Sequence, residues 1–198
     1  MNEIARISKA RPTTQVADGV PRVRWTLAEF ERLTELGFFT EDDHIELIGG
    51  ELVPMAPKGN RHDRIVGALH IWFRHNLSPD FDWHTEPGWN ADEANYFEPD
   101  ITLGPVGFDR TTIPPADLAL LIEVAHSSLS FDTTTKAGQY AALGVREYWV
   151  VNAVTLATRV HRAPTASGYE DVHTVAAKKS LTALLIPSLK IRLADLKT

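Results

Sequence analysis

The chain of 198 residues contains no cysteine. This absence excludes disulfide bonds, thiolate zinc sites and a cysteine nucleophile, and it is typical of proteins from a reducing compartment. Any metal ion must therefore be bound by His, Asp or Glu side chains.

Long apolar stretches are also missing. The longest, residues 118–125, contains a glutamate and is far shorter than the ~20 residues that a membrane-spanning helix needs. Residues 1–15 carry scattered charges and lack the apolar core of a signal peptide. We therefore expect a cytoplasmic protein that does not associate with membranes.

Positive charge is scarce, because 20 Lys and Arg residues stand against 26 Asp and Glu residues and the net charge is −6. Proteins that bind a nucleic-acid backbone usually carry a basic patch, so the overall charge argues against nucleic-acid binding. Segment 61–75 is locally basic, although Asp63 interrupts it. A solvated helix face explains this segment as well as a nucleic-acid contact does. Its basic side chains are Arg61, Arg64, Arg74, His62, His70 and His75.

Several enzyme motifs are absent from the sequence. It has no Gly-rich phosphate loop of the Walker or dinucleotide type, no Gly-x-Ser-x-Gly and no His-Glu-x-x-His. These absences argue against an ATP-driven enzyme, a serine hydrolase and a zinc hydrolase.

The composition that remains is that of a globular protein, with 43% hydrophobic and 23% charged residues. A chain of this length is expected to form one compact domain. Residues 1–22 are polar, include Pro12 and Pro21 and show no periodicity, so we expect a flexible N-terminal tail. The single domain is predicted to span residues 23–198.

The first part of this domain predicts a helix, a hairpin and a second helix. Apolar residues at helical spacing follow Thr26, which together with Glu29 has the pattern of a capping box. Gly49-Gly50 lies between two short extended runs and favours a tight hairpin turn. Residues 61–77 then return to helical spacing.

The second part predicts a sheet. A helix from about Thr133 to Leu143, capped by Asp132 or Ser130, separates two runs of strand character. Such a crossover places its two strands parallel in one sheet, so the fold is mixed α/β. The runs of strand character before the helix are 82–90, 97–103 and 118–125. The run that follows the helix is 146–152, and further strands that extend the sheet are predicted at 154–160, 172–177 and 189–193.

Two carboxylates stand out in the predicted strands. Asp100 projects from the face opposite Phe97 and Ile101 by the period of two, although a solvent-facing aspartate explains that pattern as well. Glu123 lies inside an apolar run that is typical of a strand covered on both faces. A buried carboxylate needs a cation, a metal or strong donors, and the alternative partner is a neighbouring arginine.

Lys136 shares a helical stripe with Tyr140 and Leu143 that should face the sheet. Its simplest explanation is a side chain that buries its stem and keeps its ammonium in water. With Asp100 and Glu123 it also forms a reasonable set for magnesium-assisted phosphodiester hydrolysis. Magnesium takes oxygen ligands and phosphates, and a lysine can stabilise charge on the phosphate or orient the attacking water.

The sequence resembles the Uma-type (Uma-two) restriction endonucleases of the PD-(D/E)XK superfamily. The resemblance covers most of residues 25–152 and rests on IELIGGELVPMAP, RHDRIVGAL, EPDI, LLIEVAHSS and the stretch Asp132-x-x-x-Lys136-x-x-QYAALGVREYWVV, in this order. It implies a restriction-endonuclease-like mixed β-sheet flanked by helices, with an N-terminal helix and a β-hairpin. It also implies a DNA endonuclease, a Mg²⁺ cofactor that Mn²⁺ can replace, and a homodimer.

The resemblance also implies roles for individual residues. Asp100 and Glu123 would be the metal ligands, and Lys136 would replace the lysine that the superfamily pattern has where this chain has Ala125. Glu46 and His62 would be further catalytic residues. From the residues alone, Glu46 is equally a surface strand charge, and His62 equally caps or packs its helix.

Two other function classes stay open. In the first, the same fold binds nucleic acid or protein without cutting it, which the acidic net charge and Ala125 favour. In the second, the chain is a structural partner protein, and Tyr148 and Trp149 belong to an association surface.

Overall fold

The computed structural model describes residues 13–15, 21–40 and 43–197. The chain forms two compact units, one made of Met1–Met55 with Asp92–Tyr96 and the other of Ala56–Ala91 with Phe97–Thr198. The tail predicted for residues 1–22 lies mostly outside the described residues. Its described parts belong to an antiparallel ladder of β1 (Thr13–Gln15) and β2 (Pro21–Val23). The single domain over 23–198 stays a prediction.

The first unit contains the predicted helix and hairpin. Helix α1 (Leu27–Glu35) begins with a capping box in which the Glu29 amide donates to the Thr26 hydroxyl and the Thr26 amide donates to the Glu29 carboxylate. Strands β3 (Ile45–Ile48) and β4 (Glu51–Pro54) pair antiparallel. Gly49 and Gly50 join them with φ values of 60° and 84°, which favour glycine. Both predictions are confirmed.

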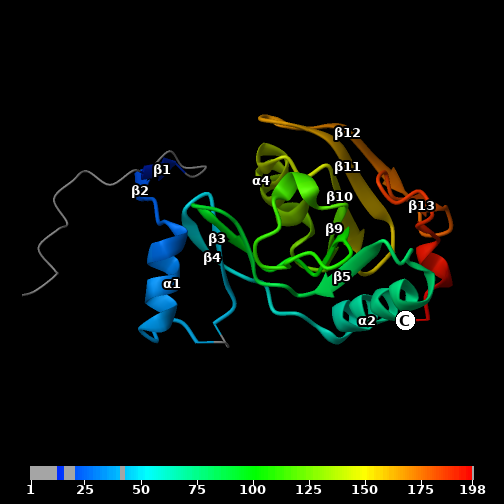
Figure 1. The fold of residues 1–198 in the computed structure, drawn as a ribbon, viewed down its shortest axis with the longest axis horizontal. Coiled ribbons are helices and arrows are strands. Elements are labelled where there is room, and N and C mark those ends of the chain that lie inside the picture. The colour runs from blue at the N-terminus through cyan, green and yellow to red at the C-terminus, as the bar shows by residue number, and fades with distance from the viewer. Residues whose placement is uncertain (1–12, 16–20, 41–42, 198) are drawn as a thin grey trace, which may run out of the picture. The chain divides into compact units, whose positions relative to one another are not determined.

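A six-stranded mixed sheet forms the centre of the second unit (Figure 1). The predicted crossover is confirmed, because β9 and β10 pair in parallel, whereas the other neighbours in this sheet pair antiparallel. In spatial order the strands are β12 (Gly168–Val175), β11 (Thr158–Thr165), β10 (Glu147–Asn152), β9 (Leu120–Ala125), β8 (Ile101–Pro105) and β5 (Phe81–Thr85).

Helices cover both faces of this sheet, so β9 and β10 are buried on both sides (Figure 1). Helix α2 (Asn60–Asn76) packs Ile65, Leu69 and Phe73 into a core cluster that also contains Ile122 and Val124 of β9. Residues of β9 alternate in direction, so Glu123 points to the opposite face, which the helix that ends at residue 143 covers.

That helix differs from the prediction. It is helical from Leu129 and consists of α3 (Leu129–Phe131), a π-helical turn (Asp132–Lys136) and α4 (Ala137–Leu143). Asp132 is therefore a buried member of the helix, and the predicted caps Asp132 and Ser130 are wrong. The Thr134 hydroxyl donates to the Ser130 carbonyl at 2.6 Å, a side-chain bond that competes with the regular helical pattern. The helix ends at Leu143, as predicted, and the next residue, Gly144, has a left-handed backbone conformation.

Two predicted strands are each divided in the structure. The run 82–90 breaks at Glu86, whose φ is 50°, and the run 97–103 breaks around Pro99, which has no amide to donate to a ladder. The separated pieces β6 (Trp89–Asp92) and β7 (Asn95–Phe97) belong to a second sheet of order β4-β3-β7-β6.

The last part of the chain extends the sheet only partly. Residues 154–157 form a turn. The strand predicted near 189–193 is present as β14 (Lys190–Ile191), but it pairs with β13 (Leu181–Thr182) in a separate two-stranded sheet, so the prediction that it extends the main sheet is wrong. Short 3₁₀ turns occupy Pro115–Asp117 and Leu193–Asp195. Across the described ranges, no helix has both the length and the apolar character to cross a membrane.

Candidate functional site

Asp100 lies in the bend immediately before β8 and is only 4% exposed. Its Oδ2 accepts a hydrogen bond of 2.7 Å from the amide of Val124 in the neighbouring strand. Its own amide donates to Glu123 Oε2 at 3.3 Å. The solvent-facing alternative is wrong, because the side chain is buried and accepts a hydrogen bond from β9, to which the backbone amide of Asp100 also donates.

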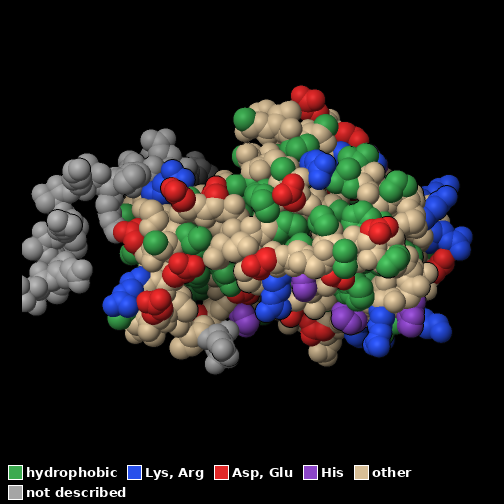
Figure 2. Space-filling model, in the orientation of Figure 1, with side chains coloured by type: hydrophobic (Ala, Val, Ile, Leu, Met, Phe, Trp, Pro, Cys, Tyr) green, Lys and Arg blue, Asp and Glu red, His purple; other side chains and the backbone are tan. Residues whose placement is uncertain are grey.

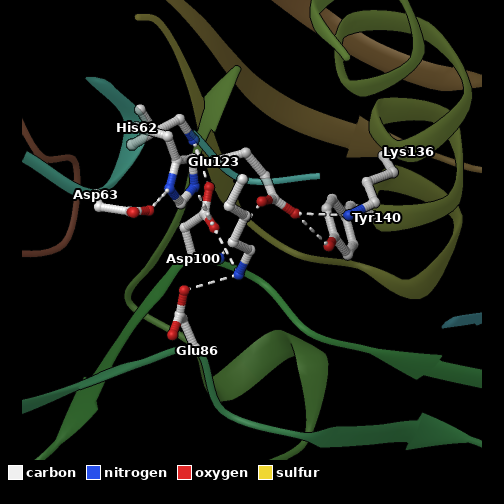
Figure 3. A network of polar contacts seen from close by, with 9 residues as sticks. His62, Asp63, Glu86, Asp100, Glu123, Lys136 and Tyr140 are labelled. Atoms are coloured by element: carbon white, nitrogen blue, oxygen red, sulfur yellow. Dashed lines mark hydrogen bonds and ion pairs between the residues drawn. The ribbon is translucent and has the colours of Figure 1, made fainter. Parts of the chain in front are cut away.

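Glu123 lies in the middle of β9 and is 5% exposed. Its Oε1 accepts from the ammonium of Lys136 at 3.0 Å and from the hydroxyl of Tyr140 at 3.1 Å (Figure 3). The predicted need for a buried partner is confirmed, and the observed cation is a lysine rather than an arginine.

The π-helical turn and α4 present Lys136 and Tyr140 to the sheet. They lie one turn apart, and both side chains point to the same carboxylate oxygen of Glu123 (Figure 3). Lys136 is 5% exposed, so its ammonium is buried and does not reach into water. Turns of the π type occur often at functional sites.

His62 projects from the first turn of α2 and is 6% exposed. Its Nε2 lies 2.8 Å from Asp100 Oδ1 and its Nδ1 lies 3.0 Å from Asp63 Oδ1, so each ring nitrogen contacts a carboxylate (Figure 3). Burial disfavours the charged ring, but the hydrogen bond and charge of Asp100 outweigh burial and raise the pKa of His62. A protonated ring donates to both carboxylates.

Lys58 completes this side of the site, and sequence reasoning missed it. Its Nζ lies 2.8 Å from Glu86 Oε1 and 3.4 Å from Asp100 Oδ1, and its side chain is 27% exposed. Burial lowers the pKa of Lys58, but the charges of Asp100 and Glu86 raise it overall. Burial likewise opposes ionisation of Asp100, yet His62 and Lys58 hold the pKa of Asp100 below its usual value.

Glu46 belongs to the other compact unit. It lies on β3 opposite Val53 and is 1% exposed, so the surface-charge alternative is wrong. Its role as an auxiliary carboxylate stays a prediction.

The donor chemistry of the site fits a hard divalent cation. Asp100, just before β8, and Glu123, in the adjacent strand β9, supply carboxylate oxygens, and the Asp100 amide donates to Glu123 Oε2. Within the described ranges, no three His, Asp or Glu side chains gather as metal ligands. Mg²⁺ commonly binds one or two carboxylates and takes its other ligands from water and substrate phosphates, so a pair is sufficient.

Comparison with known proteins assigns the chain to a family. The model of the Uma2 family, described as putative restriction endonuclease, matches residues 27–194. The chain belongs to the Uma2 family. Among solved structures, the crystal structure of a putative nuclease belonging to DUF820 from Anabaena variabilis is similar, with a TM-score of 0.69 and 14% sequence identity over 86% of this chain and 96% of that one. No curated protein matches.

Membership of the Uma2 family and the similarity in fold confirm the predicted resemblance and the restriction-endonuclease-like architecture. At 14% identity the solved structure supports the fold alone. The four site residues predicted in the second unit, Asp100, Glu123, Lys136 and His62, lie within one network of polar contacts (Figure 3).

Proposed function

We propose that this Uma2 protein is a Mg²⁺-dependent endonuclease that hydrolyses phosphodiester bonds of DNA. The observation that carries the proposal is the pair of buried, hydrogen-bonded carboxylates of Asp100 and Glu123 with Lys136 at 3.0 Å from Glu123. Membership of a family of putative restriction endonucleases supports the same activity.

In this proposal Asp100 and Glu123 hold Mg²⁺, and Mn²⁺ can take its place. When bound, the metal lowers the pKa of a water molecule and offsets phosphate charge. Lys136 stabilises negative charge on the phosphate or orients the attacking water, as buried cations do in a site of low dielectric constant. Tyr140 positions Glu123 through its hydroxyl hydrogen bond.

His62 and Lys58 act on Asp100. Both contact Oδ1 and lower the pKa of the carboxyl group, so they keep it ionised and ready to bind a cation. Because 27% of the Lys58 side chain is exposed, its ammonium can also contact a substrate phosphate. Glu46 is proposed as an auxiliary carboxylate, and the active form is proposed to be a homodimer because two sites are needed to cut both strands.

Cleavage of supercoiled plasmid tests the proposal. The wild type should nick or linearise it in Mg²⁺ and not in EDTA, and Asp100→Asn and Glu123→Gln should lower the rate by about 100-fold or more, as loss of a main electrostatic group does. Asp171→Asn is the matched control, because Asp171 lies on β12 with its side chain 53% exposed. Equal rates for wild type and Asp100→Asn would overturn the assignment.

A second candidate function is binding without cleavage on the same fold. The net charge of −6 and Ala125 at the usual lysine position favour it. Calorimetric titration with MgCl₂ separates the two, since a folded wild type that takes up neither Mg²⁺ nor Mn²⁺ supports the binding module.

A further inference from the structure

A groove of about 450 Å³ opens beside the first turns of α2. Arg61 and Arg64 line one wall, and the turn after β10, with Val154, lines the other. Ile65 and Ala153, which are 1% and 3% exposed, are its buried apolar lining. The groove therefore combines two exposed guanidinium groups with an apolar floor.

The two arginines are available for a ligand. In the part of the chain that the structure describes, neither guanidinium forms an ion pair. Asp63 lies between them in the sequence, but its carboxylate contacts the His62 ring at 3.0 Å. Figure 2 shows Lys, Arg and His side chains close together on the surface over α2, so this part of an acidic chain is locally basic.

Both walls of the groove belong to segments that contact the site of Asp100 and Glu123. His62, which contacts Asp100, lies between Arg61 and Arg64 on the same helix. On the other wall, the Ala153 amide donates to the Ala125 carbonyl at 2.8 Å, two residues beyond Glu123. A strand lying in the groove would therefore approach the carboxylate site directly.

We infer that this groove binds the sugar–phosphate backbone of a DNA strand, with Arg61 and Arg64 on neighbouring phosphates. The inference rests on the proposed function and gives the substrate its path to the site. Residues three apart on a helix are neighbours on its surface, with Cβ atoms roughly 5–6 Å apart, so the two long side chains can reach different phosphates of one strand. Guanidinium groups also match phosphate oxygens in pairs.

The salt dependence of DNA binding tests the inference without catalysis. Fluorescence anisotropy with a labelled duplex in EDTA gives the affinity between about 50 and 200 mM salt. Each lost phosphate contact lowers the slope of log affinity against log salt by about 0.9, so Arg61→Ala/Arg64→Ala should lower it by about 1.8. Over this range, wild-type affinity should fall about tenfold more than that of the double variant.

Two further variants separate the groove from charge in general. Arg74→Ala removes an exposed arginine of the last turn of α2, outside the groove, and should leave the slope nearly unchanged. Val154 is 57% exposed, so Val154→Lys leaves the fold intact and adds a cation to the opposite wall. It should tighten binding and raise the slope by about 0.9, whereas Val154→Asp should weaken binding.

The outcomes distinguish this inference from the proposed function. Three results overturn the inference that the groove binds DNA, whether or not plasmid is cleaved. They are an unchanged slope in the double variant, an equal change of slope in Arg74→Ala, and a wild type whose DNA binding does not depend on salt. If the predicted slopes hold while the wild type cleaves nothing in Mg²⁺, the groove stands and the proposed nuclease activity fails. The inference is also overturned if an RNA duplex binds more tightly than DNA and the variants leave the salt dependence of DNA binding unchanged.

Discussion

Replacing Lys136 by Met should strongly destabilise the fold. The change leaves the carboxylate of Glu123 buried without its lysine, from which it lies 3.0 Å away with both side chains 6% exposed. Breaking a buried pair from one side costs about 3–5 kcal/mol. Tyr140 and the Asp100 amide still donate to Glu123, so we expect the lower end, about 3 kcal/mol. For a chain of this size that lowers Tm by roughly 6–12 °C.

The double variant Glu123→Gln/Lys136→Met tests whether the loss of stability comes from the unpaired buried charge. Because it removes both ions, it should recover most of the stability lost in Lys136→Met. Urea denaturation followed by circular dichroism in metal-free buffer gives both values, and Lys190→Met, at an exposed lysine of β14, is the control. A loss below about 1 kcal/mol for Lys136→Met, or a double variant as unstable as the sum of the singles, would refute the buried-pair account.

Three further predictions concern neighbouring groups. Because the pKa of His62 is raised from 6.5, the stability that its protonated ring contributes to the fold is fully present below about pH 6.5 and is lost as pH rises through the raised pKa. His62→Gln should remove this dependence of folding stability on pH. Identical pH profiles for the variant and the wild type would contradict the prediction. Burial lowers the pKa of His161 to about 4, so the folded state should lose roughly 3 kcal/mol of stability as pH falls from 6.5 towards 4. His161→Phe should remove this loss. A variant whose stability falls as steeply in acid as that of the wild type would contradict the prediction. Tyr140→Phe should cost about 1–2 kcal/mol in thermal melts because Glu123 loses a hydroxyl donor, and an unchanged Tm would exclude that contribution.

The main elements of the fold could be predicted because local patterns dominate them. The Thr26 capping box, the Gly49-Gly50 turn and the parallel pair around the helix that ends at Gly144 all appear in the structure. Two of the errors occur where the backbone passes from one sheet to the other. Glu86 and Pro99 divide runs that look continuous, because their neighbours pair with different strands.

The candidate site was predicted unevenly for similar reasons. Glu123 could be recognised because an acid inside an apolar strand needs a partner, and Lys136 because it shares a stripe with Tyr140. The same stripe could have predicted the hydrogen bond of Tyr140, because Tyr140 lies one turn after Lys136 on the face directed at the sheet. Lys58 lies in an irregular segment before α2, and no periodicity links it to Asp100, so only the tertiary structure brings the two together.

The central claim is that Asp100 and Glu123 together hold a divalent metal. Anomalous scattering from crystals soaked in MnCl₂ tests it most directly, with Asp100→Asn crystals as the control. The account predicts a Mn²⁺ peak in the wild type at roughly 2.0–2.2 Å from oxygens of both carboxylates, and none in the variant. A wild-type protein that cleaves DNA in Mn²⁺ but shows its only Mn²⁺ peak away from these two carboxylates would contradict it.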